Sequence, residues 1–204
     1  NSEKIASKTA KKADYQITNM NNNNESQLDM LKKLELSHGE FKLIFDKCKD
    51  KNIDFISTPF DLDSVDFLDS LGVTTFKVGS GDLTNFLLLK KIAEKNKKII
   101  LSTGMSSMDE VKKSVEFIKH YSSNELIVLH CVSCYPTNKE DLNLNCIKTM
   151  KNELNIPIGF SDHTKDEIAS LYAVCSGAEY IEKHFTIDKN MEGPDHRASL
   201  NPEE

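Results

Sequence analysis

The chain has 204 residues, of which 38% are hydrophobic and 28% are charged, and its formal net charge is −6. This size and composition predict a single globular domain with a buried core. The acidic balance and the lack of a basic patch interleaved with aromatic residues argue against a nucleic-acid partner, and no apolar run approaches the roughly 18 residues of a membrane-spanning helix.

Residues 1–27 form a polar lead-in that includes the asparagine run 21–24, which we expect to be a loop. The sequence does not begin with Met, and no signal peptide opens it, so we expect a fragment of a cytoplasmic protein. Leucines at helical spacing follow Ser26, and Ser37 with Glu40 has the spacing of a capping box, so two helices are predicted here.

Residues 28–204 contain a repeat in which short apolar runs alternate with segments of helical periodicity. The predicted strands are residues 54–58, 74–78, 98–102, 126–131, 157–160 and 179–185. The predicted helices between them span residues 62–71, 84–94, 143–154, and 164–177 with a capping box at Thr164 and Glu167. A further helix is predicted to begin with a capping box at Ser107 and Glu110 and to turn Val111, Val115 and Ile118 inward. This alternation is typical of an α/β protein with a parallel, buried sheet.

The predicted strands all end in polar residues, mostly serine, threonine, glycine or histidine. A doubly wound sheet would gather its ligand at one switch point, whereas a barrel carries chemistry at the C-terminal end of every strand. We therefore expect a (β/α)8 TIM barrel that is incomplete in this sequence. The 204 residues would form a single partial barrel domain with about six of the eight βα units, and the first two strands would precede residue 1.

Two histidines, His163 and His184, follow the last two predicted strands. If these strands are parallel neighbours, the imidazoles lie side by side and could bind one Mn, Fe, Co or Zn ion. Each histidine also has an ordinary interpretation: His163 beside a helix N-terminus, and His184 as a hydrogen-bonded core residue. Asp162 and Glu182 flank the pair and could orient the imidazoles, or could be ordinary paired carboxylates.

Lys77 lies on the predicted strand 74–78, where its side chain could enter the barrel mouth. It could bind phosphate or form a Schiff base, or it could reach past the strand to solvent. The strand-end hydroxyls, together with glycine N–H groups, could form a cradle for phosphate or carboxylate. Downstream, the turn at Gly193 and Pro194 would fix Asp195 over the same mouth, where it could accept hydrogen bonds from a polyol, unless this is a plain surface loop.

Five cysteines give no disulfide framework and predict a reduced, cytoplasmic protein. Cys131 and Cys134 form a C-x-x-C motif, but a zinc site needs more ligands and a redox motif a different context, so we expect Cys131 to be a small buried residue. His130, in the middle of an apolar run, is predicted to be buried and hydrogen-bonded.

Six stretches taken together resemble the sialic acid synthase family, whose members condense phosphoenolpyruvate with N-acetylmannosamine or a related amino sugar and release phosphate. These stretches are STPFD (57–61), KVGSGD (77–82), LSTGM (101–105), LHCVSCYPT (129–137), FSDHT (160–164) and EKHFTIDKNMEGPDH (182–196). The resemblance implies catalytic roles for Lys77, His163 and His184, with the two histidines holding a divalent metal, usually Mn²⁺, with Mg²⁺ or Co²⁺ as alternatives. It implies a phosphoenolpyruvate site formed by Thr58, Lys77, Ser80, Ser102, Ser133 and Ser161. It further implies that the sugar is contacted by Asp82, Tyr135 and Asp195.

The sequence departs from the family pattern at Asp82, where the family commonly has Glu, and at Val132, where it often has Thr or Ser. The family's first strand with its catalytic glutamate, its second strand and its C-terminal antifreeze-like domain are not in this sequence, so we expect the chain alone to be inactive and the full-length protein to be a homodimer. The competing hypotheses are a metal-dependent hydrolase barrel, a Schiff-base aldolase that uses Lys77, and a non-catalytic fragment that binds sugar or phosphate.

Overall fold

The structure, a computed structural model, describes residues 2–13, 16–17 and 25–204, so the predicted loop at 21–24 lies outside the described residues. Its centre is a sheet of five parallel strands in the order β1-β2-β3-β4-β5. The strands are β1 (Thr75–Val78), β2 (Lys98–Ser102), β3 (Leu126–Cys131), β4 (Ile158–Asp162) and β5 (Tyr180–Lys183). All five coincide with predicted strands to within a few residues.

Eight α-helices accompany the sheet in the described part of the chain. They are α1 (Ser2–Ile5), α3 (Gln27–Leu34), α4 (His38–Asp50), α5 (Leu62–Leu71), α6 (Phe86–Ala93), α7 (Met108–Tyr121), α8 (Asn145–Leu154) and α9 (Ile168–Cys175). The predicted capping boxes of α4 and α7 are confirmed, because in each the serine accepts from the N3 backbone and the N3 glutamate accepts from the serine backbone. Within the described ranges, no helix is both long enough and apolar enough to cross a membrane.

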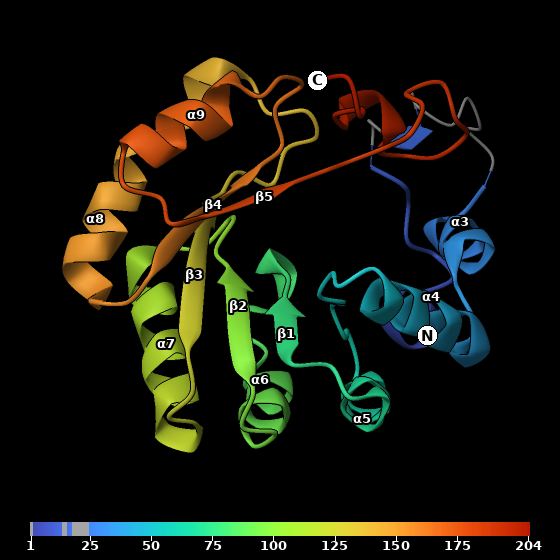
Figure 1. Cartoon of the computed structure of the whole chain (residues 1–204), viewed down its shortest axis with the longest axis horizontal. Helices are drawn as coiled ribbons and strands as arrows, with labels where there is room; N and C mark the ends of the chain where they lie inside the picture. Colours follow the sequence, from blue (N-terminus) through green and yellow to red (C-terminus); the bar gives the residue numbers. More distant parts are fainter. Residues whose placement is uncertain (1, 14–15, 18–24) are drawn as a thin grey trace.

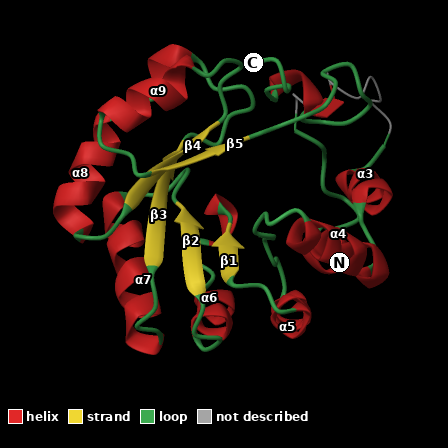
Figure 2. Ribbon diagram, in the orientation of Figure 1, coloured by secondary structure: helices red, strands yellow, loops and turns green. Residues whose placement is uncertain are grey.

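The strand order follows the chain order without reversal, so the sheet has no switch point and the doubly wound alternative is excluded. Each of the strands β1 to β4 is followed by an α-helix, and these helices, α6 to α9, lie along the outside of the curved sheet (Figures 1 and 2). This arrangement is a half-barrel, with the α/β architecture that the strand and helix alternation predicts.

The two faces of the sheet carry different side chains because successive residues of a strand point to opposite sides. One set packs beneath the helices in the hydrophobic core and includes Phe76, Val78, Ile99, Leu101, Val128, Ile158 and Phe160. The alternate set faces the inside of the half-barrel and includes Lys77, Ser102, Cys131, Ser161 and Glu182. The register supports this assignment, since Cys131 is opposite Ser161 and Ser161 is opposite Glu182.

Two predictions at the element level are wrong. Residues 54–58 form no strand, and a single bridge from Ser57 to Phe76 is their only pairing with β1. The second concerns the predicted capping box at Thr164, since α9 begins at Ile168 without a side-chain cap. The Thr164 hydroxyl instead donates to the buried carboxylate of Asp162 at 2.8 Å, a charged acceptor that competes successfully with the helix end.

Candidate functional site

Lys77 is buried at the inner face of β1, near the C-terminal edge of the sheet. Its Nζ donates to Ser102 Oγ at 2.8 Å and lies 3.4 Å from Glu182 Oε2. The alternative in which this lysine reaches solvent is therefore wrong. The inner face carries a fixed positive charge next to a hydroxyl, which is suited to an anionic ligand.

A second group of polar atoms surrounds Gly104, directly after β2. The Gly104 N–H donates to Ser80 Oγ at 2.9 Å, and Ser80 Oγ lies 3.1 Å from Cys131 Sγ. A Cβ atom added at Gly104 would overlap Ser133 Oγ and come within 3.0 Å of Ser80 Oγ and 3.1 Å of Cys131 Sγ. Only glycine lets these side chains converge, so the predicted phosphate ligands Ser80 and Ser133 lie in one hydroxyl cluster.

The two predicted metal-binding histidines are brought together. The ring centroids of His163 and His184 are 5.6 Å apart with an interplanar angle of 87°. Tyr135, a predicted sugar contact, lies against both, with ring centroids 4.2 Å from His163 and 5.7 Å from His184. Strand pairing accounts for the proximity, because Asp162 is opposite Lys183 and each histidine is the next residue.

The orientation of His163 is fixed by a backbone carbonyl. Its Nδ1 lies 2.7 Å from the Val132 oxygen, and because a carbonyl only accepts, Nδ1 carries the proton. Nε2 is therefore unprotonated, and it lies 3.2 Å from Ser161 Oγ, whose proton is donated to Glu182. Burial lowers the pKa of His163, and the neighbouring His184 adds to the effect, so the imidazole is neutral at pH 7, the form that binds a metal.

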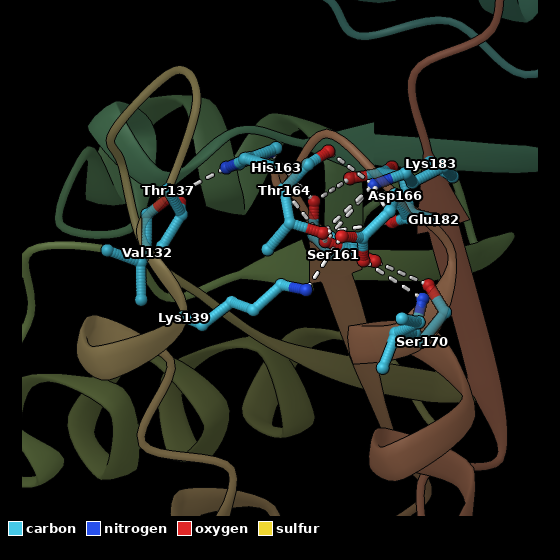
Figure 3. A network of polar contacts seen from close by, with 12 residues as sticks. Val132, Thr137, Lys139, Ser161, His163, Thr164, Asp166, Ser170, Glu182 and Lys183 are labelled. Carbon is cyan, nitrogen blue, oxygen red and sulfur yellow. Dashed lines mark hydrogen bonds and ion pairs between the residues drawn. The ribbon is translucent and has the colours of Figure 1, made fainter. Parts of the chain in front are cut away.

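Glu182 connects the lysine to the histidines. Its carboxylate pairs with Lys77 through Oε2 and accepts from Ser161 Oγ at 2.6 Å through Oε1. Ser161 in turn lies next to His163 Nε2. Figure 3 shows Ser161, Glu182 and His163 from neighbouring strand ends in one polar network. The anion-binding group and the histidine pair are thus two parts of a single site.

The donor set fits a metal ion that keeps positions open. Among the described residues no group of three or more His, Cys, Asp or Glu side chains converges to hold a metal, so His163 and His184 would supply two ligands. Two neutral imidazoles suit Mn²⁺ or a related ion, and open positions are what a catalytic metal offers to substrate and water. Metal binding itself stays a prediction.

Three predicted substrate contacts lie apart from this network. Thr58 lines a pocket of about 570 Å³ between α4, α5 and the segment that precedes α4. Asp82 Oδ1 accepts from Asn85 Nδ2 at 3.0 Å, a local contact at the start of α6. Asp195 directly precedes a short 3₁₀ helix (His196–Ala198), and its backbone carbonyl accepts from Ser199 Oγ at 2.8 Å. Their roles toward a substrate stay predictions.

Two contributions to the site were not predicted, the Cys131 thiol and the Val132 carbonyl, whereas the glycine N–H expected in the anion cradle is supplied by Gly104. Strand alternation could have placed Cys131 on the inner face beside Ser161, but the Val132 backbone carbonyl leaves no trace in residue type. The predicted burial of Cys131 and His130 is confirmed, and His130 Nε2 lies 2.7 Å from the Leu142 carbonyl oxygen.

Comparison with known proteins gives consistent matches. The profile of the NeuB family matches residues 1–204. The chain is 49% identical over 200 residues to the N,N'-diacetyllegionaminic acid synthase of Campylobacter jejuni, covering 96% of this chain and 59% of that protein. It is 43% identical over 204 residues to the synthase of the same name from Legionella pneumophila, covering 98% of this chain and 57% of that protein.

A solved structure shows the same fold. The N-acetylneuraminic acid synthetase of Leptospira borgpetersenii, determined in complex with citrate, superposes with a TM-score of 0.84 at 40% identity. The match covers 86% of this chain and 61% of that one. The chain thus spans somewhat more than half the length of the proteins it resembles.

Proposed function

The chain belongs to the NeuB family, and on that premise we propose that the full-length protein condenses phosphoenolpyruvate with N-acetylmannosamine or a related N-acetylated amino sugar to form a nonulosonic acid and phosphate. One observation carries the proposal: a buried lysine with hydroxyls and a pair of histidines lie at the same end of the sheet and are linked through Glu182. This arrangement suits two substrates, one anionic and one with a polarisable oxygen.

In this reaction carbon 3 of phosphoenolpyruvate bonds to the aldehyde carbon of the open-chain sugar, whose oxygen gains the electron pair and a proton. Water adds to carbon 2, and phosphate departs with the bridging oxygen. Lys77 and Ser102 are suited to hold the phosphate, together with the hydroxyl cluster of Ser80 and Ser133. Holding two reactants in place supplies several kcal/mol of the rate enhancement.

His163 and His184 would hold the divalent cation, for which Mn²⁺ is the first candidate. Such an ion supplies Lewis acidity toward an aldehyde oxygen. The protein's own contribution is to keep the His163 imidazole neutral by burial and to fix its ring through Val132. Tyr135 packs against both imidazoles and is suited to cover the sugar from one side.

The names of similar proteins suggest which acceptor sugar the protein uses. The Campylobacter and Legionella relatives are named as N,N'-diacetyllegionaminic acid synthases. The candidate acceptors are therefore a diacetamido sugar, N-acetylmannosamine and N-acetylmannosamine 6-phosphate. Asp82 is one methylene shorter than the glutamate common in the family. Together with Asp195 it is proposed to contact the acceptor sugar.

The test is an assay of the full-length protein with phosphoenolpyruvate, Mn²⁺ and each acceptor, in which phosphate release and product mass are measured. We expect one acceptor to support the release of phosphate from phosphoenolpyruvate in step with the formation of an acid that has a nine-carbon chain. Borohydride with pyruvate should leave Lys77 unmodified, whereas trapping on Lys77 would establish the Schiff-base aldolase instead. If none of these acceptors supports turnover, the proposed synthase activity is wrong.

The hydroxyl cluster gives a prediction of its own. Gly104→Ala in the full-length protein should raise the KM for phosphoenolpyruvate roughly tenfold, because the added methyl group displaces the Ser133 and Ser80 hydroxyls and weakens about one charge-assisted hydrogen bond. Steady-state kinetics with phosphoenolpyruvate varied measures it. Gly81→Ala is the control, since its Cβ would meet nothing within 4 Å and its KM should not change. Equal effects of the two substitutions would contradict the role of the cluster.

A further inference from the structure

A buried ion pair lies directly beneath the two histidines. Asp162 and Lys183 are the last register pair of β4 and β5, and each is followed at once by a histidine, His163 or His184. The Lys183 Nζ lies 3.2 Å from Asp162 Oδ1, with the lysine side chain 12% exposed and the aspartate side chain 0% exposed. Burial on this scale is unusual for two charges and calls for a specific role.

The ion pair and the histidines point to opposite faces of the sheet. Ser161 and Glu182 face the inside of the half-barrel, where they contact Lys77 and each other. Strand alternation therefore turns Asp162 and Lys183 outward. Consistent with this, Asp162 Oδ2 accepts from Ser170 Oγ of the outer helix α9 at 2.6 Å. The pair cannot touch a substrate inside the half-barrel and acts only through its neighbours.

Those neighbours are the backbone on either side of His163. Asp162 Oδ1 accepts from both the N–H and the hydroxyl of Thr164 at 2.8 Å. Lys183 Nζ donates to the carbonyl oxygen of Asp166 at 3.0 Å and also to that of Thr164. Figure 3 shows the Lys183 amine directed at the loop of Thr164 and Asp166. The pair thus ties β4, β5, the loop that carries His163 and α9 into one unit.

We propose that the Asp162–Lys183 pair is the positioning device that sets His163 and His184 at the separation a shared metal ion requires; this rests on the proposed metal site. The sheet ladder between β4 and β5 ends at Asp162 and Lys183, one residue before the histidines. At this last pair the Asp162–Lys183 ion pair joins the two strands on the outer face, as Ser161 and Glu182 do on the inner face one residue earlier. Residues that orient metal ligands typically change metal affinity by 10–100-fold when altered.

The experiment uses metal-free full-length protein and calorimetric titration with Mn²⁺. Lys183→Met should weaken Mn²⁺ binding roughly 10–100-fold, and Lys183→Arg, which keeps the charge, should recover most of the affinity. Asp162→Asn combined with Lys183→Met leaves no unpaired buried charge, so it should fold and should still bind Mn²⁺ weakly. Lys151→Met removes a surface pair with Glu179 and should bind like the wild type.

Activity adds a second readout. For Lys183→Met the Mn²⁺ concentration for half-maximal activity should rise by the same factor as the binding constant, while kcat at saturating Mn²⁺ is largely restored. A purely structural role would instead lower kcat at every metal concentration, and would contradict the inference.

The two proposals fail in different ways. If His163→Ala and His184→Ala bind Mn²⁺ as tightly as the wild type, the metal site itself is wrong. If those variants lose binding but Lys183→Met and the double variant bind normally, only the positioning role is wrong. Where Lys183→Met is too unstable to titrate, the double variant decides by the same criterion.

Discussion

Lys77→Met in the full-length protein is expected to lower kcat/KM for phosphoenolpyruvate by about 10²–10³-fold, the usual effect of removing one preorganised charged donor. Methionine keeps the length and the apolar stem of lysine but removes the ammonium, which donates to Ser102 and pairs with Glu182. The phosphate would then meet hydroxyls and N–H groups with no cation. Steady-state kinetics with phosphoenolpyruvate varied at a saturating acceptor concentration measures the loss.

The fold should survive this substitution, because the side chain of Glu182 is 41% exposed and can be hydrated once its partner is gone. Lys98→Met is the matched control. Lys98 also lies on a strand of the sheet and pairs with a glutamate, Glu125 at 2.8 Å, but it is at the N-terminal edge of β2. Its removal should leave kcat/KM unchanged. A loss of less than tenfold for Lys77→Met would contradict the phosphate-binding role.

The half-barrel was predictable because three of its strands, β1, β3 and β4, are buried on both faces, and such strands appear in a sequence as short, mainly apolar runs. Residues 126–131 show this most clearly, since every residue from Leu126 to Cys131 is buried. The site was predictable for a related reason. Parallel strands end at one edge, so polar residues that follow each run, such as His163 and His184, must gather there.

What the sequence could not show depends on how the segments pack in three dimensions. The segment 54–58 has the residues of a strand, but strand formation needs partners, and within the described residues it pairs with β1 at Ser57 alone. Thr164 has the spacing of a helix cap, yet the buried carboxylate of Asp162 takes its hydroxyl. The crowding around Gly104 and the cross-strand pair of Asp162 with Lys183 likewise exist only in three dimensions.

His184→Ala and His163→Ala are each expected to weaken Mn²⁺ binding at least about 100-fold and to lower kcat by about 10³-fold. Each removes one of the two imidazoles available to the ion, and Lewis acidity contributes several kcal/mol to the barrier. Calorimetric titration at pH 7.5 and turnover at fixed Mn²⁺ provide the two measurements. Burial lowers the pKa of His163 below its ordinary value of about 6.5. The imidazole is therefore neutral and able to bind the metal at about pH 6.5 and above, and metal binding is lost only as the pH falls through the lowered pKa.

His130→Asn is the matched control for the histidine variants. His130 is a buried histidine on the neighbouring strand β3, and burial lowers its pKa as well, but its ring points outward to the Leu142 carbonyl and not into the half-barrel. Its replacement should lower the unfolding midpoint and leave Mn²⁺ affinity unchanged. If His130→Asn weakens Mn²⁺ binding as much as His184→Ala, the loss reflects general damage to the sheet, and the histidine pair is not the metal site.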